Sequence, residues 1–464
     1  MDRILFSREG RLKRSGRADL GGAEVRSYEG PDLISRLPDE VLGAIVTLLD
    51  TGEGARTAAL SRRWRYIWRD FAPLNLDDES FFSSLCFGDE RHPVISQIIA
   101  AHPGPARRLS LRSLALSPYI SHFDAWLRLP VFDSIQELSL HFPVSHYHPE
   151  MPASALRFAS LRVLDINNCV FPAAGDCSSP IFPCLTHLSL RHVGIAEEHL
   201  HGIISNSPGI EAISLDTNFG YRRLCISLPR LRYLAISDRS FGEREKLSEV
   251  VVEDAASLER LLLHEVDNGP SVRITGAAKL KILGYLGAGF PIVELGNSSF
   301  KGLVPATLVE QFSTVKILAL EMPEAPKLKV VIGYLRCFPC LEKLHIMFFV
   351  NKWSLKGIVP FGLSAPIECL DRSLKTIVLQ QYSGRKPHLE FAKFFVKRAR
   401  VLEVMKFCTT ARVTSKWLEN QSKGLNIMER ASRCAQFPFV LQGHLPSRFW
   451  MDEGFSSDDP FMCD

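Results

Sequence analysis

The segment "LSRRWRYIWRD", from Leu60 to Asp70, contains two tryptophans among four arginines. Aromatic rings interleaved with guanidinium groups can stack on bases and neutralise phosphates, so these residues could form a nucleic-acid surface. The same letters also fit a short helix that buries Trp64 and Trp68 and leaves its arginines in water. The rest of the chain has to decide between these two interpretations.

Two other groups of residues have the types that bind metals. Cys337 and Cys340 form a C-x-x-C pair in "CFPC", but a zinc site needs a second ligand pair at a fixed distance and none follows. His141, His146 and His148 lie close together in "HFPVSHYHP", where two prolines indicate a loop with solvated histidines. Because glycine-rich phosphate loops and nucleophile elbows are also missing, we predict no metal, no cofactor and no catalytic residue.

A basic run, "RKPHLEFAKFFVKRAR", is a further candidate for binding anions. Its cations recur at the spacing of one solvated face of an amphipathic helix: Lys386, Lys393, Lys397, Arg398 and Arg400. The whole chain carries a formal charge of only +4 over 464 residues, so no global field attracts nucleic acid or an anionic membrane. No apolar run is long enough to span a bilayer. We therefore expect neither nucleic acid nor membrane as a partner.

The composition predicts a folded protein in a reducing compartment. The chain is 46% hydrophobic and 23% charged, which allows a large core. Its 11 cysteines are scattered through apolar stretches such as "INNCVF" and lack the density of a disulfide scaffold, which favours the cytoplasm, the nucleus or both. The first thirty residues lack the apolar middle of a secretory signal, and we expect a disordered basic tail over residues 1–30.

Three short helices are expected at the start of the folded region. Pro38 suits a first turn, and Asp39 and Glu40 place negative charge at the positive end of the first helix. Apolar residues then recur at helical spacing: Val41, Leu42, Ile45, Leu48 and Leu49. A third helix begins near Ser61 and carries Leu60, Trp64, Ile67 and Trp68 on one face. A unit this small is expected to need a partner surface to complete its core.

These residues carry a family resemblance. "LPDEVLGAIVTLL" followed by "ARTAALSRRWRYIW" closely resembles the F-box of plant F-box proteins. The resemblance implies that the unit docks on a Skp-type adaptor and through it joins a cullin-based ubiquitin ligase. Carried over by position, it assigns the adaptor contact to seven residues: Leu37, Pro38, Val41, Leu42, Ile45, Leu60 and Trp64. Trp68 is expected in the packing of the unit itself or in its junction with the next unit.

One departure from the F-box pattern lies between the first two helices. The chain has "DTGEGAR" there, and a glycine inside a helix costs about 1 kcal/mol relative to alanine. The second helix is therefore expected to be short or partly formed because of Gly52 and Gly54. A weakened F-box leaves open a second interpretation, in which the protein is a scaffold that binds partners without ubiquitin transfer.

From about Leu109 a leucine-rich pattern, L-x-x-L-x-L, recurs at variable intervals and predicts a solenoid. The instances are "LSLRSLAL", "IQELSLHF", "LRVLDINNCVF", "LTHLSLRHVGI", "IEAISLDTN", "LRYLAISD", "LERLLLHEV", "LKILGYL", "VKILALEM", "LEKLHIMFF", "LKTIVLQQY" and "LEVMKFC". Each predicts a short strand with alternate residues inward, for example Leu161, Leu164 and Ile166. Helical or irregular returns, such as "EEHLHGIISNSPG", would connect the strands into a right-handed, parallel sheet.

The repeats resemble the leucine-rich repeats of plant F-box proteins. The segment "LKTIVLQQYSGRKPHLEFAKFFVKRARVLEVMKF", with the tail "FSSDDPF", resembles the FBD region that follows such repeats. In that region we expect a helix bearing Leu389, Ala392, Phe395 and Val396 to pack between two strands of the same sheet.

The predicted fold class is therefore α/β, with an N-terminal three-helix F-box followed by a right-handed leucine-rich-repeat solenoid with a parallel sheet. The predicted organisation is a tail (1–30), an F-box (31–76), a linker helix region (77–108), irregular leucine-rich repeats (109–364), an FBD region (365–435) and a C-terminal tail (436–464). The expected function is that of a non-catalytic substrate-recognition subunit of a Skp-cullin-F-box ligase, whose repeats bind an unidentified target protein. The alternative is the leucine-rich-repeat scaffold without ubiquitin transfer.

Overall fold

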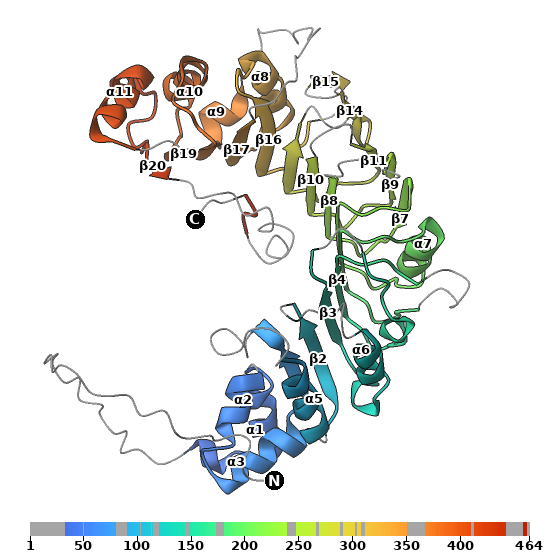
Figure 1. Ribbon diagram of the computed structural model, residues 1–464. Coiled ribbons are helices and arrows are strands. Elements are labelled where there is room, and N and C mark those ends of the chain that lie inside the picture. Colours follow the sequence, from blue (N-terminus) through green and yellow to red (C-terminus); the bar gives the residue numbers. More distant parts are fainter. Residues whose placement is uncertain are drawn as a thin grey trace, which may run out of the picture.

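The computed structural model has the form of a curved arc, with the N-terminal helices at one end and α10 (Lys386–Arg398) and α11 (Ser415–Leu425) at the other (Figure 1). It describes residues 33–49, 51–79, 91–102, 104–112, 114, 120–144, 148–172, 181–238, 247–265, 269–287, 291–301, 304–307, 311–349, 367–409, 413–441 and 458–461. The predicted tail over residues 1–30 lies outside these ranges. No helix in the described ranges combines the length and the apolar character needed to cross a membrane.

The first unit is a small helical bundle. Its elements are η1 (Ile34–Arg36), α1 (Asp39–Val46), α2 (Thr51–Thr57), α3 (Arg62–Tyr66) and a π-helical turn, η2 (Ile67–Phe71). Ser61 caps α3, because its hydroxyl accepts a hydrogen bond from the Trp64 amide. The α2 helix contains both Gly52 and Gly54, so the expected short second helix is present.

A 14-stranded sheet forms the inner side of the arc, and each of its strands pairs in parallel with the next. In spatial order the strands are β1 (Leu74–Asp77), β2 (Ala106–Leu111), β3 (Glu137–His141), β4 (Val163–Asn167), β5 (His187–Arg191), β6 (Ala212–Asp216), β8 (Tyr233–Asp238), β10 (Arg260–Glu265), β12 (Ile282–Leu286), β16 (Ile317–Pro323), β17 (Lys343–Phe349), β18 (Thr376–Gln380), β19 (Val404–Thr409) and β20 (Phe439–Leu441). Every predicted leucine-rich segment overlaps one of these strands, from β2 to β19. The first and last strands, β1 and β20, lie outside those segments.

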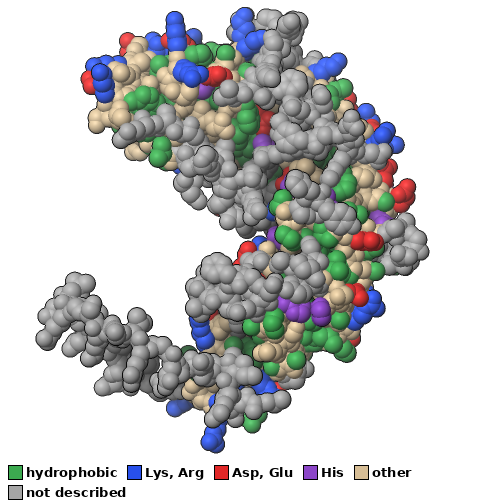
Figure 2. All heavy atoms as spheres, in the orientation of Figure 1, with side chains coloured by type: hydrophobic (Ala, Val, Ile, Leu, Met, Phe, Trp, Pro, Cys, Tyr) green, Lys and Arg blue, Asp and Glu red, His purple; other side chains and the backbone are tan. Residues whose placement is uncertain are grey.

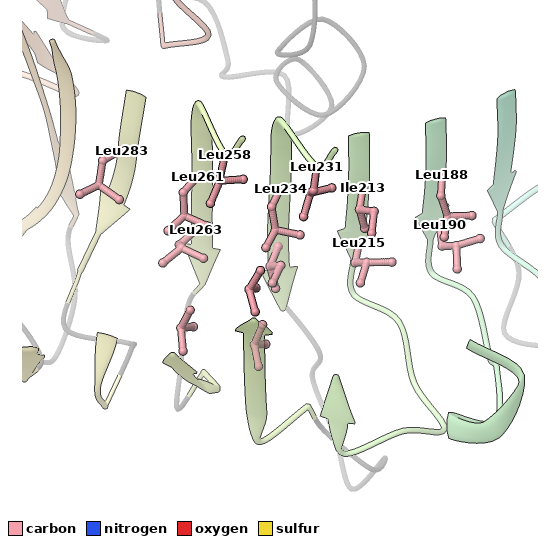
Figure 3. Close-up of a cluster of buried hydrophobic side chains, with 14 of the residues drawn as sticks. Leu188, Leu190, Ile213, Leu215, Leu231, Leu234, Leu258, Leu261, Leu263 and Leu283 are labelled. Carbon is pink, nitrogen blue, oxygen red and sulfur yellow. The ribbon is translucent and has the colours of Figure 1, made fainter. Parts of the chain in front are cut away.

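Alternate residues of the strands fill one continuous core between the sheet and the connections on its outer side. Leu188 and Leu190 of β5 are buried in it, as are Leu261 and Leu263 of β10. Figure 3 shows these side chains and their equivalents in neighbouring strands in one row across the sheet. Burying one such leucine contributes about 2 kcal/mol. The parallel pairing therefore places the core leucines of each repeat against those of the next repeat.

The connections between strands are of two kinds, and one of them differs from the expectation. Some returns are helical, as predicted: α5 (Arg91–Ala101), α6 (Ile120–Leu127), α7 (Glu197–Ser205), α8 (Leu328–Cys337) and α9 (Glu368–Arg372). Others form a second sheet of six strands, β7 (Arg223–Ser227), β9 (Glu249–Glu253), β11 (Ser271–Ile274), β13 (Val293–Leu295), β14 (Ser298–Lys301) and β15 (Val304–Thr307). The prediction of only helical or irregular returns was wrong there, because in β7 the buried Leu224 and Ile226 alternate with exposed residues, as strand residues do.

A repeated backbone turn follows several strands. The residue directly after β4, β5, β6, β9 and β18 has a positive φ, of 60° at Asn168, 52° at His192, 53° at Thr217, 55° at Asp254 and 54° at Gln381. After β6, the buried Asn218 ties two repeats together: its side-chain oxygen accepts a hydrogen bond from the Val193 amide and its side-chain nitrogen donates to the Leu190 carbonyl, each at 2.9 Å.

Replacing Asn218 tests how much this turn contributes to stability. Asn218→Leu would leave the Val193 amide and the Leu190 carbonyl buried without their partner. Because each such group costs about 1–3 kcal/mol, we expect the free energy of unfolding in urea to fall by about 2–4 kcal/mol. Asn420→Leu, at an exposed position of α11, is the control and should change it by less than about 0.5 kcal/mol. Equal effects of the two substitutions would contradict this role.

Candidate functional site

Arg63 holds the beginning of α1 against α3. Its guanidinium forms an ion pair with Asp39 at 2.7 Å and donates hydrogen bonds to the carbonyls of Ser35 and Leu37. A planar guanidinium can serve several acceptors at once, which a lysine cannot do in the same way. The Arg63 side chain stays 39% exposed and, in addition, fixes the loop that carries Leu37 and Pro38.

The α1 helix has two apolar stripes. Leu42 and Val46, at 0% and 3% exposure, fill the core of the helical unit. Val41 and Ile45 form a second stripe and are 43% and 42% exposed, and Leu48, in the turn after α1, is 83% exposed. A helix that is apolar on both faces is normally covered on both faces. The exposed stripe is therefore a candidate docking surface.

The predicted adaptor-contact residues differ in exposure. Pro38, Val41, Ile45 and Leu60 are exposed, with Leu60 at 69%. Leu37 and Trp64 are half-buried against the core of the helical unit. Leu42 is completely buried in that core, so its side chain has no exposed surface to offer a partner. The assignment of the seven residues to the adaptor contact stays a prediction.

Sequence reasoning assigned no contact to five other exposed apolar residues of this unit: Leu33, Ile34, Leu48, Tyr66 and Phe71. Leu48 follows the end of α1 but continues the helical spacing of Val41 and Ile45, and this spacing was the signal that could have identified it. No comparable periodicity marks Leu33 or Ile34.

Two glycines allow close packing inside the helical unit. A Cβ on Gly54 would lie 3.2 Å from the ring of Trp68, and a Cβ on Gly43 would lie 2.7 Å from the Phe71 carbonyl oxygen. Gly54 thus gives Trp68 its place against α2. Gly54, one of the two glycines that depart from the F-box pattern, therefore has a packing role.

Trp68 connects the helical unit to the sheet, as expected. Its ring meets the His102 ring edge-on at 5.2 Å, and its carbonyl oxygen is 3.2 Å from His102 Nε2. Burial lowers the pKa of His102, which keeps the ring neutral. Nearby, the Asn75 side chain of β1 donates a hydrogen bond to the Thr47 carbonyl at 2.9 Å. The first strand is therefore fastened to the helices.

We expect Gly43→Ala to destabilise the helical unit by about 1–2 kcal/mol. Alanine gains about 1 kcal/mol of helix propensity, but its Cβ would overlap the backbone of Phe71, and such overpacking costs more than that gain. Thermal unfolding and the rate of proteolytic cleavage in this unit measure the change. Ala44→Ser, at the neighbouring exposed position, is the control, and a Gly43→Ala protein as stable as this control would refute the packing argument.

A second candidate surface is the inner face of the sheet, where charged side chains cross the first repeats. Asp165 of β4 accepts hydrogen bonds from Arg112 at 3.1 Å and His141 at 2.9 Å. Arg191 and Asp216 continue the row at 3.7 Å. Burial would raise the pKa of Asp165, but the hydrogen bond from His141 and the charges of His141, Arg112 and Arg191 lower it overall.

Asp165→Leu should lower the free energy of unfolding by about 3 kcal/mol. The substitution leaves Arg112 and His141 on a largely buried face without the carboxylate that they contact. Asp133→Leu is the matched control, because Asp133 is 59% exposed and its ion pair with Arg157 is worth less than about 1 kcal/mol. Equal urea midpoints for the two variants would show that the row does not hold the sheet.

The histidines and cysteines that were considered as metal ligands contact other parts of the protein. His141 belongs to β3 and bonds Asp165, so the prediction of a solvated loop was wrong for it; His148 lies 5.3 Å from the Phe219 ring, and His146 is outside the described residues. Cys337 ends α8, and burial raises the pKa of its thiol to about 12. Within the described ranges, no group of three or more metal-binding side chains comes together.

The basic run forms α10, as predicted. Ala392, Phe395 and Val396 are buried and Leu389 packs against the core. In the sequence α10 lies between β18 and β19, which pair directly with each other, so the helix covers the sheet and does not separate its strands. Lys393 and Lys397 pair with Glu390 and Glu429 at 2.8 Å and 3.0 Å. Figure 2 shows basic and acidic side chains mixed over this end of the arc, which is typical of a solvated face.

Comparison with known proteins assigns three regions of the chain. The F-box domain model matches residues 34–76, the model of the leucine-rich repeats of FBD-associated F-box protein At5g56370 matches 123–346, and the FBD model matches 363–407. F-box/FBD/LRR-repeat protein At1g13570 of Arabidopsis thaliana is 25% identical over 81% of this chain and 91% of its own length. F-box/FBD/LRR-repeat protein At3g52680 of the same plant is 25% identical over 89% of this chain and 94% of its own length.

The fold therefore defines a leucine-rich-repeat solenoid with a small helical unit at its beginning. The chain therefore carries an F-box, leucine-rich repeats and an FBD region in this order, and in this organisation it is similar to the F-box/FBD/LRR-repeat proteins of Arabidopsis thaliana.

Proposed function

We propose that the protein is the target-recognition subunit of a Skp-cullin-F-box ubiquitin ligase. In this proposal the helical unit docks on a Skp-type adaptor, and through it on a cullin, while the solenoid holds a target protein. The F-box match over residues 34–76 and the exposed stripe of α1 support the first part.

The exposed stripe is the observation on which the proposal depends most. Val41 and Ile45 leave apolar surface on a helix whose opposite face already fills its own core, and Leu48 in the turn after the helix adds to the exposed apolar surface. Covering such a stripe with a complementary apolar groove is favourable by about 25 cal/mol for each Å² removed from water. Recognition of an amphipathic helix by a hydrophobic groove is a common binding mode.

The chain would contribute to the reaction by position. Holding the target and the conjugating enzyme on one scaffold makes transfer to the target effectively intramolecular, so no catalytic residue is required of this chain. Its residence in the cytoplasm or the nucleus, where the ligase would act, stays a prediction from the sequence.

The scaffold alternative depended on a degenerate F-box. Its premise was a second helix weakened by Gly52 and Gly54, whereas α2 spans both glycines and Gly54 packs against Trp68. We therefore favour the ligase subunit. Adaptor binding without any change in the lifetime of captured proteins would favour the scaffold.

The double substitution Val41→Ala and Ile45→Ala tests adaptor docking. Both side chains are exposed, so the fold should persist, while the loss of buried interface area should weaken binding to a Skp-type adaptor about tenfold or more. Binding is measured by titrating purified adaptor in a calorimeter or by surface plasmon resonance.

Met428→Ala is the matched control, because it truncates an apolar side chain that is 92% exposed in the turn η7 (Ile427–Glu429), which directly follows α11. Its affinity for the adaptor should equal that of the unmodified protein. Unchanged adaptor binding by the Val41 and Ile45 variant, or no adaptor binding by the unmodified chain, would refute the proposal.

A further inference from the structure

The inner face of the sheet carries a second apolar cluster. Leu261 and Leu263 of β10 point into the core, whereas Leu262 between them belongs to a cluster with Tyr285 and Met347 on the other strand face. All three are nearly inaccessible, at 0%, 3% and 4% exposure. Among the described residues of this cluster, Phe461 is the member that the sheet does not supply.

Phe461 comes from a C-terminal segment, residues 458–461, that lies on the inner side of the arc (Figure 1). Its side chain is 3% exposed and meets the Tyr285 ring edge-on at 5.0 Å. The Gln380 side chain donates a hydrogen bond to the Phe461 carbonyl at 2.9 Å. Tyr285 of β12 thus contacts the aromatic ring of Phe461, and Gln380 of β18 binds its backbone.

Asp459 is the second anchor of the segment. Its carboxylate accepts hydrogen bonds from Lys343 Nζ at 3.1 Å and from His345 Nε2 at 3.2 Å, both from β17. Burial would raise the pKa of Asp459, but the bond and charge of His345 and those of Lys343 lower it to about 2. The carboxylate is therefore ionised at neutral pH.

The segment resembles a ligand bound to the sheet. Asp459 and Phe461, with one residue between them, are buried, whereas Asp458 is exposed and Pro460 is half-buried. The Phe461 amide bonds the Asp459 carboxylate at 3.2 Å, which turns both side chains toward the same surface. The contacts made by these two residues are chiefly with groups more than eighty residues away in sequence, on the sheet.

We propose that this surface, formed by Tyr285, Lys343, His345 and Gln380, is a binding site for a target peptide with an aspartate two positions before a phenylalanine, and that the C-terminal segment occupies it as an internal competitor. This inference rests on the proposed role of the solenoid in holding a target. Lys343 and His345 select the acidic group, the cluster around Tyr285 selects the aromatic ring, and Gln380 binds the peptide backbone. A target that offers the same pattern displaces the segment.

The test uses the full chain with the segment released. In the variant Asp459→Ala with Phe461→Ala, a fluorescent peptide of sequence SSDDPF, amidated at its C-terminus, should bind with an affinity measurable by fluorescence anisotropy. The unmodified chain should bind it at least about tenfold more weakly, because a tethered segment competes at a high effective concentration. A peptide in which the second aspartate and the phenylalanine are replaced by alanine should bind neither protein.

Two further variants of the released chain assign the site. Lys343→Ala should weaken the peptide about tenfold by removing a charged partner of the aspartate. Lys375→Ala is the matched control, because that exposed lysine pairs with Glu403 away from the segment, and it should leave the affinity unchanged. If the released variant loses the circular dichroism of the parent, Asp459→Asn alone replaces it and should show the same order of affinities.

Equal peptide affinity of the released and unmodified chains, or no binding by a folded released chain, would overturn this inference. Adaptor binding is measured on the same proteins and should be unchanged by all of these substitutions. Failure of the peptide site is thereby distinguished from failure of the proposed ligase role.

Discussion

Parallel pairing in register is the constraint on which the structure depends. Leu164 of β4 lies beside Leu188 of β5, which lies beside Ile213 of β6. The register shifts between β1 and β2 and between β12 and β16. Because side chains alternate along a strand, a slip of one residue would move every core leucine to the inner face. The register therefore determines both the core and the residues presented to the hollow of the arc (Figure 2).

The strands of the large sheet could be predicted because their signal is strong and local. Each repeat has the same apolar pattern, so a strand that is ambiguous in one repeat can be assigned by comparison with the neighbouring repeats. The second sheet had a weaker signal, as in "EVVVE", where Val250 and Val252 are buried in a run too short to distinguish a strand from an irregular return. The strands β1 and β20 are only four and three residues long and lack the full L-x-x-L-x-L pattern, and their pairing with neighbours shows that they belong to the sheet.

The candidate site was predictable in composition but not in detail. The spacing of Leu42 and Ile45 places both on apolar positions of one helix, and sequence alone cannot tell which stripe meets the core. The contacts of Arg63 depend on the crossing of α1 and α3. The contact between Asp459 and His345 joins residues 114 positions apart, and no periodicity in the sequence connects them.

The fastening of β1 to the helices has a geometric consequence. Because the Asn75 side chain bonds Thr47 and the His102 ring meets Trp68 edge-on, the sheet begins directly at the helical unit with no long connection between them. The number of repeats then determines how far a bound target lies from the helical unit. Inserting or deleting one repeat would move and rotate everything bound beyond it relative to the first helices, by an amount set by the twist between neighbouring strands. In such a molecule, the number of repeats sets both the distance and the relative orientation between the first helices and whatever is bound further along the sheet.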